Sequence, residues 1–122
     1  MKKFITLTAI LEGLTGFALI AVTDRVIEFL LGQPPHSPEG KITAMLAGSA
    51  ILSLAVICWL LREIQGLQQL VKGMLFYKGA VIAIILIGVF WYGLSGPGLW
   101  LVIFAHAVLF GWGVVTLKDK RS

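Results

Sequence analysis

Four apolar stretches of 19 or 20 residues occupy most of this chain of 122 residues, and they constrain its fold more than any other feature. They cover residues 4–22, 42–61, 74–92 and 99–117. A helix needs about 20 apolar residues to cross about 30 Å of hydrocarbon at a rise of about 1.5 Å per residue. The sequence therefore predicts an all-α fold, a four-helix transmembrane bundle with its helices running up-down-up-down.

The composition agrees with a single transmembrane domain that spans residues 1–122. The chain is 58% hydrophobic and 13% charged, whereas a soluble domain is about half apolar and about a quarter charged. A chain this short cannot bury so much apolar surface in water, so the expected partner is a lipid bilayer. The first stretch is longer than the apolar region of a signal peptide and contains Glu12, so we expect it to be retained as a helix.

Two amphipathic segments are predicted at the membrane surface. In residues 23–31, apolar side chains share one helical face, and Asp24, Arg25 and Glu28 form a solvated face. In residues 64–72, apolar and polar side chains likewise fall on opposite helical faces. This pattern predicts an interfacial helix or an early start of the third membrane helix.

Two connections also have recognisable signals. Ser37-Pro38-Glu39 predicts the start of the second membrane helix, with Ser37 as the capping residue and Pro38 in the first turn. Residues 93–98 read GLSGPG, a tight uncharged turn that makes the last two membrane helices an antiparallel hairpin.

Eight of the ten basic residues fall on one side of the predicted bundle, and Arg25 and Lys41 fall on the other side. The eight are Lys2, Lys3, Arg62, Lys72, Lys78, Lys118, Lys120 and Arg121. Such a bias over short loops places both termini in the cytoplasm. Because these residues lie at segment ends instead of forming a stripe, nucleic acid is not an expected partner.

Glu12 is the most informative residue for function because it lies about 12 Å into the first helix. An acidic side chain near mid-membrane costs about 2.5–3.5 kcal/mol. Thr8, Glu12, Thr15 and Gly16 follow helical spacing, so we expect their face to look into the bundle. Glu12 is then either a proton- or cation-binding carboxylate or a hydrogen-bonded group that holds helices together.

His106 lies near the middle of the fourth helix, at a depth within about 5 Å of Glu12. The first and last helices are neighbours in a simple four-helix ring, so the sequence predicts that Glu12 and His106 share an interior site. His106 is alternatively a core histidine or a haem or metal ligand. His36, the other histidine, falls in the outer loop, and one carboxylate with one histidine is too few ligands for a metal site.

Three further residues have structural and functional interpretations. Tyr77 and Lys78 are expected at the cytoplasmic interface, with Lys78 extending to water, although either could instead reach inward towards Glu12. We include Tyr77 with Glu12, His106, Thr8 and Thr15 in the candidate buried polar site. Cys58 belongs to a stripe of small residues expected to pack against another helix, with Ala44, Gly48, Ile51 and Ala55.

Three segments carry a resemblance to known proteins: LTAILEGLTGFALIAVTDRVIEFLLG, KITAMLAGSAILSLAVICWLLR and GLWLVIFAHAVLFGWGVV. Together they resemble a group of small bacterial four-helix membrane proteins and, more distantly, DoxX-like proteins. That pattern has a proline where Thr23 stands. The resemblance implies a four-helix bundle in a bacterial inner membrane and carries over no activity, cofactor or site residue.

Three classes of function remain open at this point. The favoured one is a binding or accessory membrane component, as a homo-oligomer or in a larger complex. The second is a proton-coupled transporter similar to small multidrug resistance proteins, which use a glutamate in the first helix as Glu12 is placed here. The third is a quinone- or haem-associated redox protein. The sequence contains no nucleotide-binding or hydrolase motif, so an enzyme is not expected, and no catalytic residue or cofactor is assigned.

Overall fold

The computed structural model describes residues 1–119, which form five α-helices and no strand. The helices are α1 (Lys2–Ala21), α2 (Thr23–Leu31), α3 (Pro38–Leu61), α4 (Gln68–Tyr92) and α5 (Pro97–Asp119). All except α2 are long and apolar enough to cross a membrane. The predicted all-α architecture with four membrane helices is therefore confirmed.

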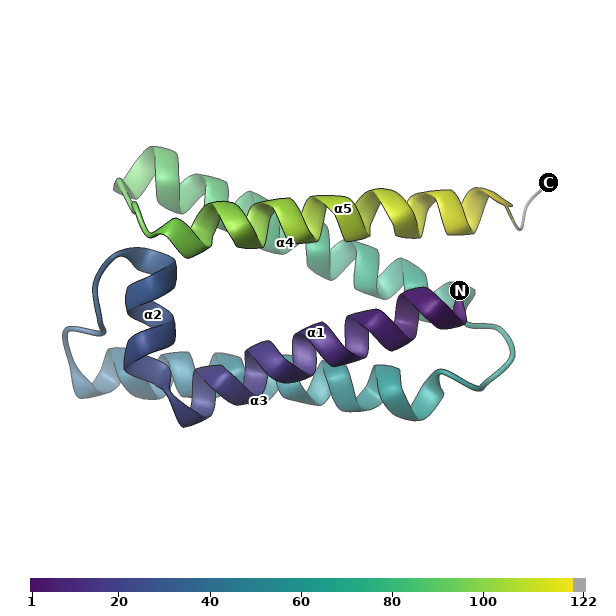
Figure 1. Cartoon of the computed structure of the whole chain (residues 1–122), viewed down its shortest axis with the longest axis horizontal. Helices are drawn as coiled ribbons and strands as arrows, with labels where there is room; N and C mark the ends of the chain where they lie inside the picture. The colour runs from purple at the N-terminus through teal and green to yellow at the C-terminus, as the bar shows by residue number, and fades with distance from the viewer. Residues whose placement is uncertain (120–122) are drawn as a thin grey trace.

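The four long helices form two layers, each an antiparallel pair (Figure 1). One layer contains α1 and α3, and the other contains α4 and α5. The N-terminus, the α3–α4 connection and the end of α5 lie at one end of the bundle, whereas α2 and the α4–α5 turn lie at the other. The long helices therefore alternate in direction.

Glycine lets α1 and α3 approach closely at Gly16 and Gly48. A Cβ atom added to Gly16 would lie 2.6 Å from the backbone nitrogen of Leu52, and one added to Gly48 would lie 2.9 Å from the carbonyl oxygen of Gly16. Gly48, Ala55 and Cys58 are buried. The small-residue stripe thus packs against a neighbouring helix as expected, because small side chains allow backbone contact without voids.

The two layers meet in an apolar core near the N-terminal end of α1. Phe4 and Ile5 are fully buried there, and the Phe4 ring packs edge-on against Trp112 with their centroids 5.7 Å apart. Val71 and Leu75 contribute side chains from α4. This end of the bundle is therefore closed by side chains from both layers.

At the opposite end, α2 crosses between the layers (Figure 1). It begins after a break at Val22, and the Thr23 hydroxyl donates to the carbonyl of Leu19 at 2.7 Å. It ends at Gly32, whose left-handed backbone (φ 87°) suits glycine. The predicted amphipathic segment 23–31 is this helix, with Asp24 exposed on its outer face.

The start of α4 differs from the apolar pattern, whereas the start of α3 is as predicted. Residues 64–67 form turns and α4 begins at Gln68, so the separate interfacial helix predicted over 64–72 is wrong and the alternative of an early helix start is correct. At α3, the Ser37 side chain accepts a hydrogen bond from the Gly40 nitrogen at 3.1 Å, as its capping role predicts. The early start adds residues 68–73 to the N-terminal end of α4, and its C-terminal end at Tyr92 is as predicted.

Candidate functional site

Glu12 lies on the inner face of α1, where only 3% of its surface is exposed. Thr8 and Gly16, one turn away on either side, are buried on the same face. This face turns towards the bundle, where its small and polar residues can contact other helices, whereas Leu14 and Phe17 are exposed on the opposite face of α1. The carboxylate thus enters a space bordered by α4 and α5.

Lys78 of α4 is completely buried and pairs with Glu12. Its ammonium nitrogen lies 2.9 Å from Glu12 Oε1. The expectation that Lys78 extends to water is wrong. Its side chain turns inwards to Glu12, so none of its surface is exposed. Two buried charges remain in hydrocarbon because each is the partner of the other.

Tyr77 contacts the second oxygen of the same carboxylate. Its hydroxyl donates to Glu12 Oε2 at 3.3 Å. The neighbouring residues Tyr77 and Lys78 therefore both turn towards α1, one to each carboxylate oxygen. This matches the inward alternative that the sequence left open for both residues.

His106 of α5 reaches the cluster from the third side. Its Nε2 atom lies 3.6 Å from Glu12 Oε1, and its ring packs at 60° to that of Tyr77 with centroids 6.2 Å apart. Glu12 and His106 therefore lie in one interior site, as the sequence predicted from their similar depths. The other ring nitrogen, Nδ1, lies 2.9 Å from the carbonyl oxygen of Val102.

The two threonines of the predicted site behave differently. Thr8 is fully buried, and its hydroxyl has no hydrogen-bond partner among the described residues. Thr15 is exposed and donates to the carbonyl of Leu11 at 2.8 Å, so its placement in the buried site is wrong. Helical rotation does not account for this exposure, because Thr15 is rotated by only about 20° from Thr8, whereas Gly16, rotated by about 80°, is buried.

Burial separates the cluster into an inner and an outer half. Glu12 and Lys78 are buried, whereas Tyr77 is half-buried and 13% of the His106 side chain is exposed. A molecule approaching the ion pair would therefore meet Tyr77 and His106 first. On the sealed side, Cys58 of α3 is fully buried and within electrostatic range of both ions.

The carboxylate of Glu12 connects the two layers of the bundle. Its polar partners Lys78, Tyr77 and His106 all belong to the α4–α5 layer, whereas Glu12 belongs to the α1–α3 layer. Charge-assisted hydrogen bonds are stronger than neutral ones, and more so where water is excluded. The cluster therefore holds the middle of the bundle together where the two layers have no glycine contact like that of Gly16 and Gly48.

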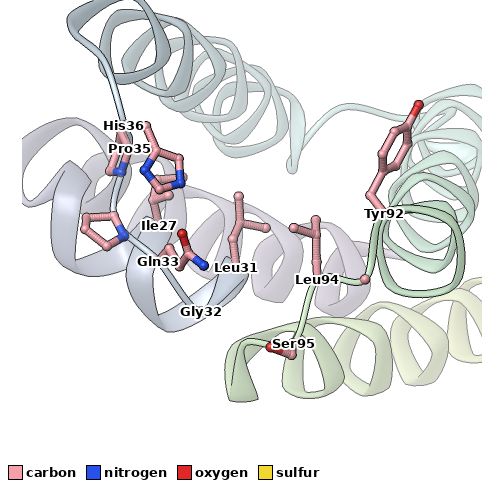
Figure 2. A pocket seen from close by; sticks show the side chains of 11 residues that line it. Ile27, Leu31, Gly32, Gln33, Pro35, His36, Tyr92, Leu94 and Ser95 are labelled. Carbon is pink, nitrogen blue, oxygen red and sulfur yellow. The ribbon is translucent and has the colours of Figure 1, made fainter.

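A pocket lies away from the cluster, at the α2 end of the bundle, between the α2–α3 loop and the α4–α5 turn (Figure 2). This pocket of about 400 Å³ includes Gln33, His36 and Ser95 in its lining. The structure does not bring His36 and His106 together, since His106 lies about 14 Å along α5 from that end. Within residues 1–119, no group of three or more His, Cys, Asp or Glu side chains could hold a metal ion.

Lys78 is the site residue that the sequence did not assign. The signal was present, because a lysine within a 25-residue apolar helix needs either a route to water or a counter-charge. The structure supplies the counter-charge, because the ammonium nitrogen of Lys78 lies 2.9 Å from Glu12 Oε1.

Fold and site together define the chain as a small multi-pass membrane protein with a buried polar cluster around the Glu12–Lys78 contact between two helical layers. Comparison with protein-family models, with curated proteins and with solved structures finds no match.

Proposed function

We propose that this protein is a membrane-embedded binding protein whose ligand site is the cluster of Glu12, Lys78, Tyr77 and His106. The observation that carries the proposal is the pair of buried atoms without hydrogen-bond partners, Thr8 Oγ1 and His106 Nε2, beside a fully buried ion pair. In hydrocarbon, a cluster with only a structural role would satisfy each of its polar atoms internally. Unsatisfied atoms next to the ion pair are what a site for a polar group requires.

The ligand follows from the surroundings. The exposed side chains around the bundle are large and apolar, so a ligand reaching His106 from the bilayer is lipid-soluble. Its head group donates to His106 Nε2 and accepts from the ammonium of Lys78, which has N–H groups beyond the one that meets Glu12. A hydroxyl or carboxyl group on an apolar body has this chemistry.

Two alternatives are less well supported by the same contacts. In a transporter of the small multidrug resistance type, Glu12 would need to be open to a second cation, but Lys78 already neutralises it at 2.9 Å. A haem held by two histidines would require His36 beside His106, and they lie at different levels of the bundle. A quinone carbonyl would accept from Lys78 but would leave His106 Nε2 without a donor.

The test is the mass spectrum of small molecules extracted from protein purified in a mild detergent. Parent protein and a His36→Ala control should both retain the same lipid-soluble molecule, because His36 lies outside the cluster. A His106→Ala variant should lose most of it. If parent protein and His106→Ala carry only detergent and bulk lipid in equal proportions, the cluster is not a ligand site.

The same proposal places both termini in the cytoplasm of a bacterial inner membrane. Its support is the distribution of Lys and Arg, although Lys78 no longer counts towards it and Lys120 and Arg121 lie outside the described residues. Arg62 anchors its end of the bundle, with its guanidinium 3.8 Å from the centre of the Trp59 ring. Assembly as a homo-oligomer or in a larger complex stays a prediction.

A further inference from the structure

We infer that His106 Nε2 and Glu12 Oε1 together form a binding site for one exchangeable proton. The coupling of this proton to a ligand rests on the proposed function, whereas proton binding itself needs no other ligand. The inference starts from the tautomer of His106. Its Nδ1 lies 2.9 Å from the Val102 carbonyl oxygen, which can only accept, so Nδ1 carries a hydrogen atom.

With the hydrogen on Nδ1, a neutral imidazole presents a lone pair at Nε2. That lone pair faces Glu12 Oε1 at 3.6 Å, so two acceptors point at one another in a water-poor space. Nε2 has no hydrogen-bond partner among residues 1–119. A proton bound to Nε2 converts the repulsion into an imidazolium–carboxylate hydrogen bond, for which the atoms need to approach by only about 0.5 Å.

The neighbouring ionisable groups direct the proton to His106. Lys78 of α4 donates to Glu12 Oε1 from its ammonium, and Tyr77 donates to Oε2. Cys58 of α3 is a buried thiol that interacts electrostatically with both Glu12 and Lys78. The cluster is neutral when Glu12 and Lys78 are charged, and it gains one positive charge when His106 takes the proton. The bond formed is N–H at Nε2, and the proton comes from hydronium and returns to water.

This site couples the proposed ligand to protons. A ligand hydroxyl that donates to Nε2 needs the lone pair which a bound proton removes, so the ligand and the proton compete for one atom. Reciprocal linkage then requires ligand binding to release the proton, and acidification to weaken ligand binding. The Nε2 atom is buried, but 13% of the His106 side chain is exposed, so the proton enters the cluster past the His106 ring and not past the Glu12–Lys78 contact.

The experiment is nitrogen NMR of ¹⁵N-histidine-labelled protein in micelles without added ligand. The chain has two histidines, so a His36→Ala variant leaves only His106 to observe. We expect a hydrogen on Nδ1 and a bare Nε2 at the alkaline end, and uptake of one proton at Nε2 between about pH 9 and about pH 4. Glu12→Gln should move the midpoint by about one pH unit or more, since one charge at this distance has such an effect.

Two outcomes would overturn the inference. One is a neutral ring with its hydrogen on Nε2, and the other is a ring that takes up no proton across that range. Both can be read from the His36→Ala spectrum alone, so the inference stays testable if Glu12→Gln does not fold. Failure here is distinct from failure of the binding proposal, which is decided by the extracted small molecules.

Discussion

Removing one member of the Glu12–Lys78 pair should destabilise the bundle far more than removing both. Glu12→Gln leaves a fully buried ammonium without a counter-charge, and Lys78→Met leaves a carboxylate with only the hydroxyl of Tyr77 and the ring of His106. Breaking a buried pair in this way costs about 3–5 kcal/mol. Both side chains are at most 4% exposed, so solvent screening does not reduce that figure.

The double variant Glu12→Gln/Lys78→Met replaces two charges by neutral groups of similar shape. Such replacements are neutral or stabilising by about 1–4 kcal/mol, because neither charge must then be kept out of water. The two single changes should therefore be strongly non-additive, with a coupling energy of about 3 kcal/mol or more. The measurement is the free energy of unfolding by sodium dodecyl sulfate in mixed micelles, followed by tryptophan fluorescence.

Lys2 and Glu63 provide a matched control. Their charged atoms are 2.8 Å apart, as close as those of the buried pair, but their side chains are 59% and 60% exposed. The Lys2 hydrogen bond lowers the pKa of Glu63, so any stabilisation is present at neutral pH and is lost as pH falls through that pKa. At neutral pH, Lys2→Met should change the unfolding free energy little. Additive effects of Glu12→Gln and Lys78→Met would refute the reasoning.

Two further predictions concern packing and topology. Gly16→Ala places a Cβ atom 2.6 Å from the backbone of α3 and should destabilise the fold by about 1–3 kcal/mol, whereas Gly111→Ala meets nothing within 4 Å and should be neutral or stabilising in the same unfolding assay. Equal effects would mean that the α1–α3 contact is not tight. In a Cys58→Ala background, Ser37→Cys should react with a membrane-impermeant thiol reagent in intact cells and Gln65→Cys only after permeabilisation. The reverse pattern would invert the bundle.

Much of the architecture follows from local chemistry. The capping of α3 by Ser37 depends on residues three positions apart, and the contact of Gly48 with α1 depends on spacing along one helix. The inward position of Glu12 also follows from the sequence, because a carboxylate cannot face lipid at low cost. Thr15 was misplaced because helical spacing gives the direction of a side chain but not whether a neighbouring helix covers it at that level of the bundle.

The sequence by itself determined four apolar helices, their alternation, the amphipathic α2 and the level of Glu12 and His106, since each depends on hydropathy and on the rise of a helix. Only the tertiary structure decided the partner of Glu12. The apolar pattern of α4 marks where side chains prefer lipid, but it does not mark where the helix begins or how it is rotated. The structure shows that Lys78 is fully buried and faces α1, where the Glu12 carboxylate compensates its charge.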